Sequence, residues 1–174
     1  MKYFVAEANP EFYQPELKNW YNILNPRLIS QCRYDEIPGS LIFEVEPNPR
    51  AFVTDIISFP YFMITYEAES VLKLYDPRLS YCRMDLFDTL NGNVKPYLLP
   101  FFETIDCLTD KTTYTRDHSD VISPVMNLNK TAGLSIFRPM GFSNKKAVIS
   151  LELAESLLRR KIRGLFLTEI ELEV

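Results

Sequence analysis

The residue types with the greatest chemical capacity gather in one polar segment, residues 115–120, which reads Thr-Arg-Asp-His-Ser-Asp. It holds the only histidine of the chain, His118, between Asp117 and Asp120. An imidazole beside carboxylates can serve as a general base or as part of a weak metal site. A Ser-His-Asp or Cys-His catalytic site would also have to use His118. The same composition is common in solvated loops, and we favour that interpretation.

Motifs for phosphate binding and acyl transfer are absent. The five glycines are scattered along the chain, and no GxGxxG, GxxxxGK[ST] or GxSxG pattern occurs. A glycosidase needs only two carboxylates, but most candidates fall on predicted solvent faces or helix N-termini. We therefore predict no catalytic residue, no metal and no cofactor. A small hydrolase that uses carboxylates and His118 remains the enzymatic alternative.

The three cysteines are an odd number and lie far apart, at Cys32, Cys82 and Cys107. Without a CxxC pair, neither a zinc site nor a disulfide framework is indicated. We expect these cysteines to be buried small hydrophobic residues in a reducing cytoplasm. The N-terminus has no apolar segment typical of a secretion signal, and no apolar run approaches the roughly 18 residues of a membrane helix. We therefore expect no membrane association.

The composition indicates one folded domain over residues 1–174. Hydrophobic residues make up 47 % of the chain, which suffices for a sizeable core without a disulfide or metal. Nineteen basic residues against 23 acidic ones give a net charge of −4. This balance argues against non-specific binding to nucleic acid, which relies on excess positive charge. It is compatible with a basic partner.

The elements that must position these residues are short. Prolines are dense between residues 9 and 60, which favours short elements and loops over long helices. Thr65 can cap a helix that continues to about Tyr75, and residues 109–130 are typical of a long polar loop. Alternation and apolar runs predict strands at residues 2–8, 41–46, 61–65, 97–108, 134–138 and 147–149.

The C-terminus carries the clearest local pattern, a strand–helix–strand unit. Ser150 is a good N-cap, and Gly164 occupies the position expected of a left-handed residue after the helix. In the strand that follows, Glu169, Glu171 and Glu173 alternate with apolar residues and predict a solvent-facing side. The chain is therefore predicted to be an α+β domain with a mixed, mostly antiparallel sheet and a few helices. Whether its two strand–helix units share one sheet is left open.

Aromatic and acidic clusters are the candidates for a binding surface. Trp20-Tyr21 and residues 59–62 (Phe-Pro-Tyr-Phe) are the densest aromatic clusters, and such residues are enriched at protein interfaces. Packing in the core is the more common role for such clusters. Acidic side chains suit a basic partner. The residues that we expect to bind a partner are Trp20, Tyr21, Asp117, Asp120, Glu169 and Glu171.

Several segments in order resemble one family. They are Lys2-Tyr3-Phe4-Val5, Asp55-Ile56-Ile57-Ser58-Phe59-Pro60, Tyr97-Leu98-Leu99, Ile105-Asp106-Cys107-Leu108, Ile136-Phe137-Arg138, Ala147-Val148-Ile149-Ser150 and Gly164-Leu165-Phe166-Leu167. This order resembles the bacterial immunity protein family numbered eleven among polymorphic-toxin immunity proteins. The resemblance spans most of the chain, from Met1 to Val174, and is strongest from Leu134 onward.

The resemblance implies a function in binding. Members of that family are cytoplasmic proteins that neutralise a cognate secreted toxin by direct contact. The implied partner is therefore a toxin domain, and the family supplies no catalytic residues to carry over. A third hypothesis is a structural component of a mobile element, which predicts homo-oligomers in place of a complex with a toxin.

Overall fold

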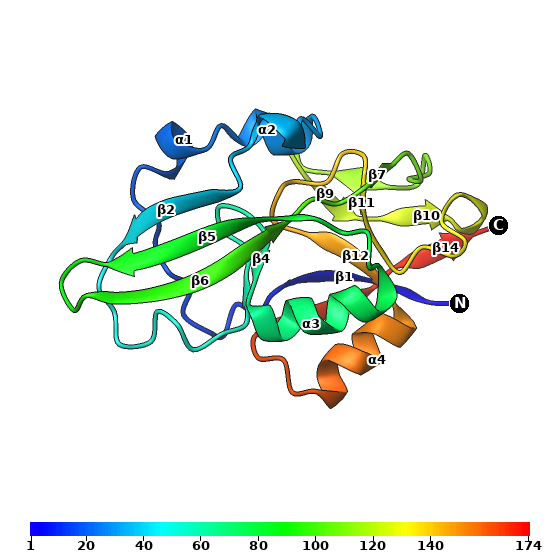
Figure 1. Cartoon of the computed structure of the whole chain (residues 1–174). Coiled ribbons are helices and arrows are strands. Elements are labelled where there is room, and N and C mark those ends of the chain that lie inside the picture. Colours follow the sequence, from blue (N-terminus) through cyan, green and yellow to red (C-terminus); the bar gives the residue numbers. More distant parts are fainter.

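Two five-stranded sheets organise the chain, as the computed structural model of all 174 residues shows (Figure 1). The first joins both ends of the sequence in the order β13-β1-β12-β11-β7, and the second comes from the middle in the order β2-β5-β6-β4-β3. The first contains β1 (Tyr3–Ala8), β7 (Thr104–Ile105), β11 (Ile136–Pro139), β12 (Ala147–Ser150) and β13 (Leu165–Glu169). The second contains β2 (Ser40–Val45), β3 (Ile56–Ile57), β4 (Met63–Ile64), β5 (Tyr81–Asp88) and β6 (Asn93–Pro100).

Most strand pairs are antiparallel, and the parallel ones are β2 with β5, β7 with β11, and β10 with β14. Two small sheets pair β8 (Thr113–Tyr114) with β9 (Val121–Ser123), and β10 (Val125–Asn127) with β14 (Glu171–Glu173). The predicted α+β class with mixed, mostly antiparallel strands is confirmed. The two strand–helix units do not share a sheet, because β4 and β12 belong to different ones.

Helices α3 (Tyr66–Tyr75) and α4 (Leu151–Arg159) pack together on the side that both sheets share (Figure 1). Each has an apolar stripe at helical spacing, which favours burial of one side. Their buried residues join those of both sheets in one core: Ala6, Ile56, Ile64, Ala68, Val71, Leu72, Leu98, Ala147, Ile149, Leu153, Ala154 and Leu157. The two sheets are therefore held by a common hydrophobic cluster.

The opposite faces of the two sheets are covered by irregular chain. Segments around α1 (Trp20–Ile23), α2 (Pro26–Ser30) and the short 3-10 helix η1 (Tyr34–Glu36) cover the second sheet. The prediction of short elements between residues 9 and 60 is confirmed. Residues 107–126 cover the first sheet, and the predicted loop at 109–130 holds short strands and a 3-10 helix, η2 (Leu128–Lys130).

The two predicted helix caps differ in their contacts. Ser150 Oγ accepts a hydrogen bond from the Leu153 amide at 3.3 Å, so this cap is confirmed. Thr65 also precedes its helix, but its hydroxyl donates to Asp55 Oδ1 at 3.1 Å. The other Asp55 oxygen accepts from the Arg163 amide at 2.7 Å and from Arg163 Nε at 3.3 Å. The buried Asp55 thus joins the start of α3 to the turn after α4.

The prediction that Gly164 is the left-handed residue that ends α4 is wrong. The left-handed residue after the helix is Lys161, with φ of 58°, and the Ile162 amide donates to the Leu157 carbonyl at 3.2 Å. Gly164 also has a positive φ, 77°, but for another reason. A Cβ atom on Gly164 would lie 2.7 Å from Thr54 Cγ2 and 2.8 Å from Thr54 Cβ. Glycine is therefore required at this position, where the segment before β13 of the first sheet touches the segment before β3 of the second.

Other predictions hold only in part. The extended segment at 61–65 is a strand only over β4, and the one at 97–108 divides between β6 and β7. The predicted C-terminal strand is interrupted at the buried Ile170, so β13 and β14 belong to different sheets. Cys82 and Cys107 are buried as expected, but Cys32 is exposed, because it follows α2 at the surface. No helix has the length and apolar character that crossing a bilayer requires.

Replacement of Gly164 tests the contact between the halves. Gly133→Ala is the matched control, because Gly133 has φ of 83° and nothing lies within 4 Å of its added Cβ. Left-handed backbone alone costs an alanine about 1 kcal/mol. Gly164→Ala adds a clash that rotation of Thr54 cannot relieve, so its free energy of unfolding should fall by about 1–3 kcal/mol more. Urea denaturation measures both, and equal losses would contradict the role of this contact.

Candidate functional site

A hollow of about 340 Å³ lies where α1 and α2 meet the loops that precede β4, β9 and β12. Aromatic rings, hydroxyls, one amide and one ammonium surround it. No carboxylate or imidazole lines it, and no group of three His, Cys, Asp or Glu side chains anywhere in the chain is arranged to hold a metal ion. The lining residues are Trp20, Pro26, Ser30, Phe59, Pro60, Ser119, Phe142, Ser143, Asn144 and Lys145.

Trp20 forms the centre of an aromatic cluster at this hollow. Its ring meets those of Tyr21, Phe59 and Tyr61 edge to face, with centroids 5.6, 5.7 and 5.8 Å away. Tyr61 is fully buried, and its hydroxyl donates to the Leu24 carbonyl at 2.7 Å. The cluster is therefore anchored in the core at one end. Its other end is open, since Tyr21 is 59 % exposed and Phe59 47 %.

A cation lies beside this open end. Lys145 Nζ is 5.1 Å from the centre of the Phe59 ring, within the range of a cation–π contact. The neighbouring Asn144 fixes this loop, because its Nδ2 donates to the Pro26 carbonyl at 3.1 Å. Asn144 Oδ1 is buried and has no hydrogen-bond partner. The hollow therefore presents exposed rings and a lysine on a loop that is tied to the opposite wall.

Asp120 holds the loops behind the hollow. Its carboxylate accepts hydrogen bonds from the Ser143 amide at 3.1 Å and hydroxyl at 3.0 Å, and pairs with Lys146 Nζ at 2.9 Å. Burial opposes ionisation, but the Lys146 ammonium and the amides of Ser143 and Val121 hold the pKa of Asp120 below its usual value. The structure thus places this predicted partner residue in an internal network.

The segment around His118 is a tight surface turn. The Thr115 and Ser119 hydroxyls and the Ser119 amide donate to Asp117, and they lower its pKa to about 2. His118 is exposed and stacks on Tyr114, with centroids 5.3 Å apart. It lines none of the four hollows of the surface. The geometry around this imidazole therefore gives no support to the hydrolase hypothesis.

The six predicted partner residues divide into two groups. Trp20 lines the hollow and Tyr21 packs against its ring, whereas Asp117 and Asp120 lie outside the lining and accept hydrogen bonds from Ser119 and Ser143. Glu169 and Glu171 lie in β13 and β14, and α1 and β14 are at opposite ends of the molecule (Figure 1). Glu169 pairs with Lys2 at 2.8 Å. The structure therefore brings the first four residues to the hollow or to the loops behind its wall, and it separates the two glutamates from them.

The aromatic residue Phe59 and the cation Lys145 were missing from the predicted set. Phe59 belongs to a segment with a strong aromatic signal, but the sequence does not distinguish its exposed ring from the buried rings of Tyr61 and Phe62. Lys145 carries no signal of its own. Its role depends on a contact with a residue 86 positions earlier, which no local pattern reveals.

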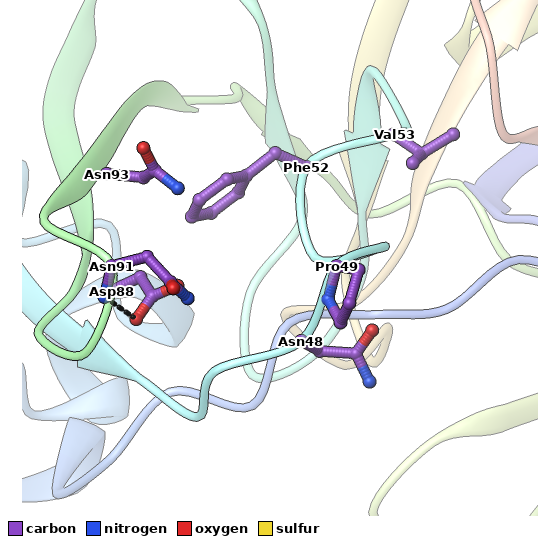
Figure 2. A pocket seen from close by; sticks show the side chains of 7 residues that line it. All are labelled: Asn48, Pro49, Phe52, Val53, Asp88, Asn91 and Asn93. Carbon is purple, nitrogen blue, oxygen red and sulfur yellow. Dashed lines mark hydrogen bonds between the residues drawn. The ribbon is translucent and has the colours of Figure 1, made fainter.

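A second hollow, of about 360 Å³, lies between the loop after β2 and the turn of the β5–β6 hairpin. Figure 2 shows Phe52, Pro49 and Asn93 around it, with Asp88 and Asn91 joined by a hydrogen bond. Asp88 is its only titratable residue. That carboxylate accepts hydrogen bonds from the Asn91 side chain and from the Asn91 and Leu90 amides, which lower its pKa. This hollow therefore offers no pair of groups for acid–base chemistry.

The Asp120 network predicts a pH-dependent loss of stability. Asp120→Asn should lower the free energy of unfolding by about 1–3 kcal/mol at pH 7, because Lys146 loses its charged partner. The folded-state pKa of Asp120 is depressed, so this stabilisation is present above about pH 4 and is lost as the pH falls further. Urea denaturation at pH 7 and pH 3 measures the difference. Asp117→Asn, at an exposed site, is the control and should cost less.

No protein-family model matches this chain. A search of curated proteins also finds no matching relative. What the chain does must therefore be inferred from its sequence features and from the geometry of the aromatic hollow.

Proposed function

We propose that this chain is a binding protein that neutralises a bacterial toxin by direct contact, with the hollow around Trp20 at the centre of the contact. Two independent features support the proposal. The first is the order of segments that resembles the immunity proteins of polymorphic-toxin systems. The second is the group of exposed aromatic rings around a hollow that lacks carboxylates and imidazoles.

The arrangement of Trp20, Tyr21 and Phe59 carries the proposal. Tryptophan and tyrosine, together with arginine, dominate the binding energy of protein interfaces, and they act best in pockets near the interface centre. The rings are positioned before binding, since Trp20 rests on the buried Tyr61. Binding therefore loses little side-chain freedom, which favours affinity.

Charge favours a basic toxin surface. The net charge of −4 creates a weak overall attraction for a positively charged partner, which raises the association rate more than the affinity. Lys145 provides one local cation that can meet an acidic or carbonyl group at the centre of the contact. We therefore expect a mostly basic partner surface with one acceptor opposite Lys145.

Binding alone suffices for neutralisation. A stable complex of standard size buries about 800 Å² on each partner. That is about a tenth of the 9162 Å² of accessible surface of this chain. Such an area covers the aromatic hollow and its surrounding loops, and on the toxin it can cover a substrate site. No reaction by the immunity protein is needed in this mechanism.

The test is co-expression with the C-terminal domain of the toxin encoded beside this chain. The wild-type chain should restore growth of the toxin-producing cells and should co-purify with the toxin domain. Phe59→Ala should weaken binding about 10- to 100-fold, because anchor residues contribute about 2 kcal/mol or more. Phe166→Ala is the matched control, since Phe166 is 43 % exposed in β13, away from the hollow.

Two outcomes would contradict this proposal. Equal affinities for the Phe59→Ala and Phe166→Ala variants would remove the hollow from the interface. Absence of both capture and protection would reject toxin neutralisation itself. Size-exclusion chromatography of the chain alone separates the structural hypothesis, which predicts homo-oligomers.

A further inference from the structure

A buried cation without an anion lies in the first sheet, at Arg138 of β11. The residue is only 3 % exposed, and its Nε, Nη1 and Nη2 atoms all lack a hydrogen-bond partner. The guanidinium lies over the Phe102 ring, 5.4 Å from its centre. A cation–π contact offsets only part of the cost of removing a charge from water. Arg138 is therefore a positive charge that the fold leaves unsatisfied.

Two titratable side chains, Tyr34 and Cys32, act on this charge, and neither is a carboxylate. Burial lowers the pKa of Arg138, and these two groups oppose that shift. Burial also raises the pKa of Tyr34 to about 12. The Tyr34 hydroxyl donates to the Phe102 carbonyl at 2.9 Å and stays neutral. Cys32 is therefore the one neighbour that chemistry can convert into an anion.

Strand pairing and one side-chain contact connect Cys32 to Arg138. Arg138 pairs with Thr104 in the parallel ladder of β11 and β7, so both side chains project from the same face of the sheet. Thr104 Oγ1 lies 3.0 Å from Cys32 Sγ. The sulfur is therefore held at the face of the sheet from which the guanidinium projects.

The environment of Cys32 differs from those of the other cysteines. Burial raises the pKa of both Cys82 and Cys107 to about 11, which makes them unreactive. Cys32 is exposed, and its backbone is left-handed, with φ of 54°. That conformation is uncommon outside glycine, asparagine and aspartate. An exposed thiol held in an unusual conformation beside an unpaired cation has the features of a reactive cysteine.

We propose that Cys32 is a modification site for hydroperoxides, and that Arg138 binds the anionic sulfur group that oxidation creates. The thiol loses its proton, and the sulfur attacks one peroxide oxygen. An S–O bond forms while the O–O bond breaks, and the leaving oxygen takes up a proton to give water or an alcohol. The sulfur loses the two electrons that the peroxide gains. A second equivalent of peroxide gives the sulfinate, a permanent anion at neutral pH.

A pair of isosteric variants tests the charge pairing without any oxidant. Asp and Asn both tolerate the left-handed backbone of position 32, but only Asp supplies an anion. The melting temperature of Cys32→Asp should exceed that of Cys32→Asn by about 3 °C, since a new ion pair forms with Arg138. The difference should disappear when both are combined with Arg138→Met. If Cys32→Asp and Cys32→Asn have equal melting temperatures while Arg138 is kept, the proposed pairing is wrong.

Oxidation itself is followed by mass spectrometry of peptides after addition of hydrogen peroxide. Cys32 should be oxidised before Cys82 and Cys107, and Arg138→Met should slow its oxidation at least threefold. An unchanged rate in a folded Arg138→Met protein would overturn the proposal. If that variant does not fold, the oxidation rate of Cys32 in the folded wild-type chain is compared with its rate in the wild-type chain unfolded by urea. Faster oxidation of Cys32 in the folded chain supports the proposal, and slower oxidation rejects it.

Discussion

The carboxylate of Asp55 fixes the position of the first sheet with its helix α4 relative to the second sheet with its helix α3. Asp55 directly precedes β3 of the second sheet, and its carboxylate accepts hydrogen bonds from the Thr65 hydroxyl before α3 and from the Arg163 amide after α4. The Asp55 amide in turn donates to the Arg163 carbonyl at 2.9 Å. A hydrophobic core alone permits neighbouring helices to slide, because burial has no direction. Directional bonds to one buried carboxylate remove that freedom, and the close approach of Gly164 to Thr54 depends on it.

The hollow around Trp20 and Phe59 also depends on how the two sheets are positioned relative to each other. Trp20 and Phe59 come from segments around the second sheet, Asn144 comes from the loop between β11 and β12 of the first sheet, and Ser119 comes from the turn of the small β8–β9 sheet. The loops are joined where the Phe62 amide donates to the Asn144 carbonyl at 2.8 Å and the Asn144 side chain reaches Pro26. Neither half alone holds all walls of the hollow. The arrangement of these walls therefore depends on the junction between the two sheets.

Local patterns in the sequence predicted what local physics determines. The N-cap at Ser150, the helix after Thr65 and the alternation that buries Phe43 and Val45 all depend on residues a few positions apart. Features that depend on distant contacts were not predicted. Gly164 looked like a helix terminator, although Thr54 explains it, and the aromatic site lacked Lys145 because its contact spans 86 residues. The break at Ile170 likewise follows from pairing with β1 and β10, far away in the sequence.

Three buried or half-buried charges, those of Asp55, Asp120 and Arg138, differ in whether the fold supplies them with partners. Asp55 and Asp120 have amide, hydroxyl and cationic partners that satisfy the oxygens of their carboxylates. Arg138 has no such partner, although it is the most deeply buried cation of the chain. A fold that satisfies its other internal charges gains no stability from this exception. The unsatisfied charge therefore marks the position where an anion must be supplied, and Cys32 is the neighbour able to supply it.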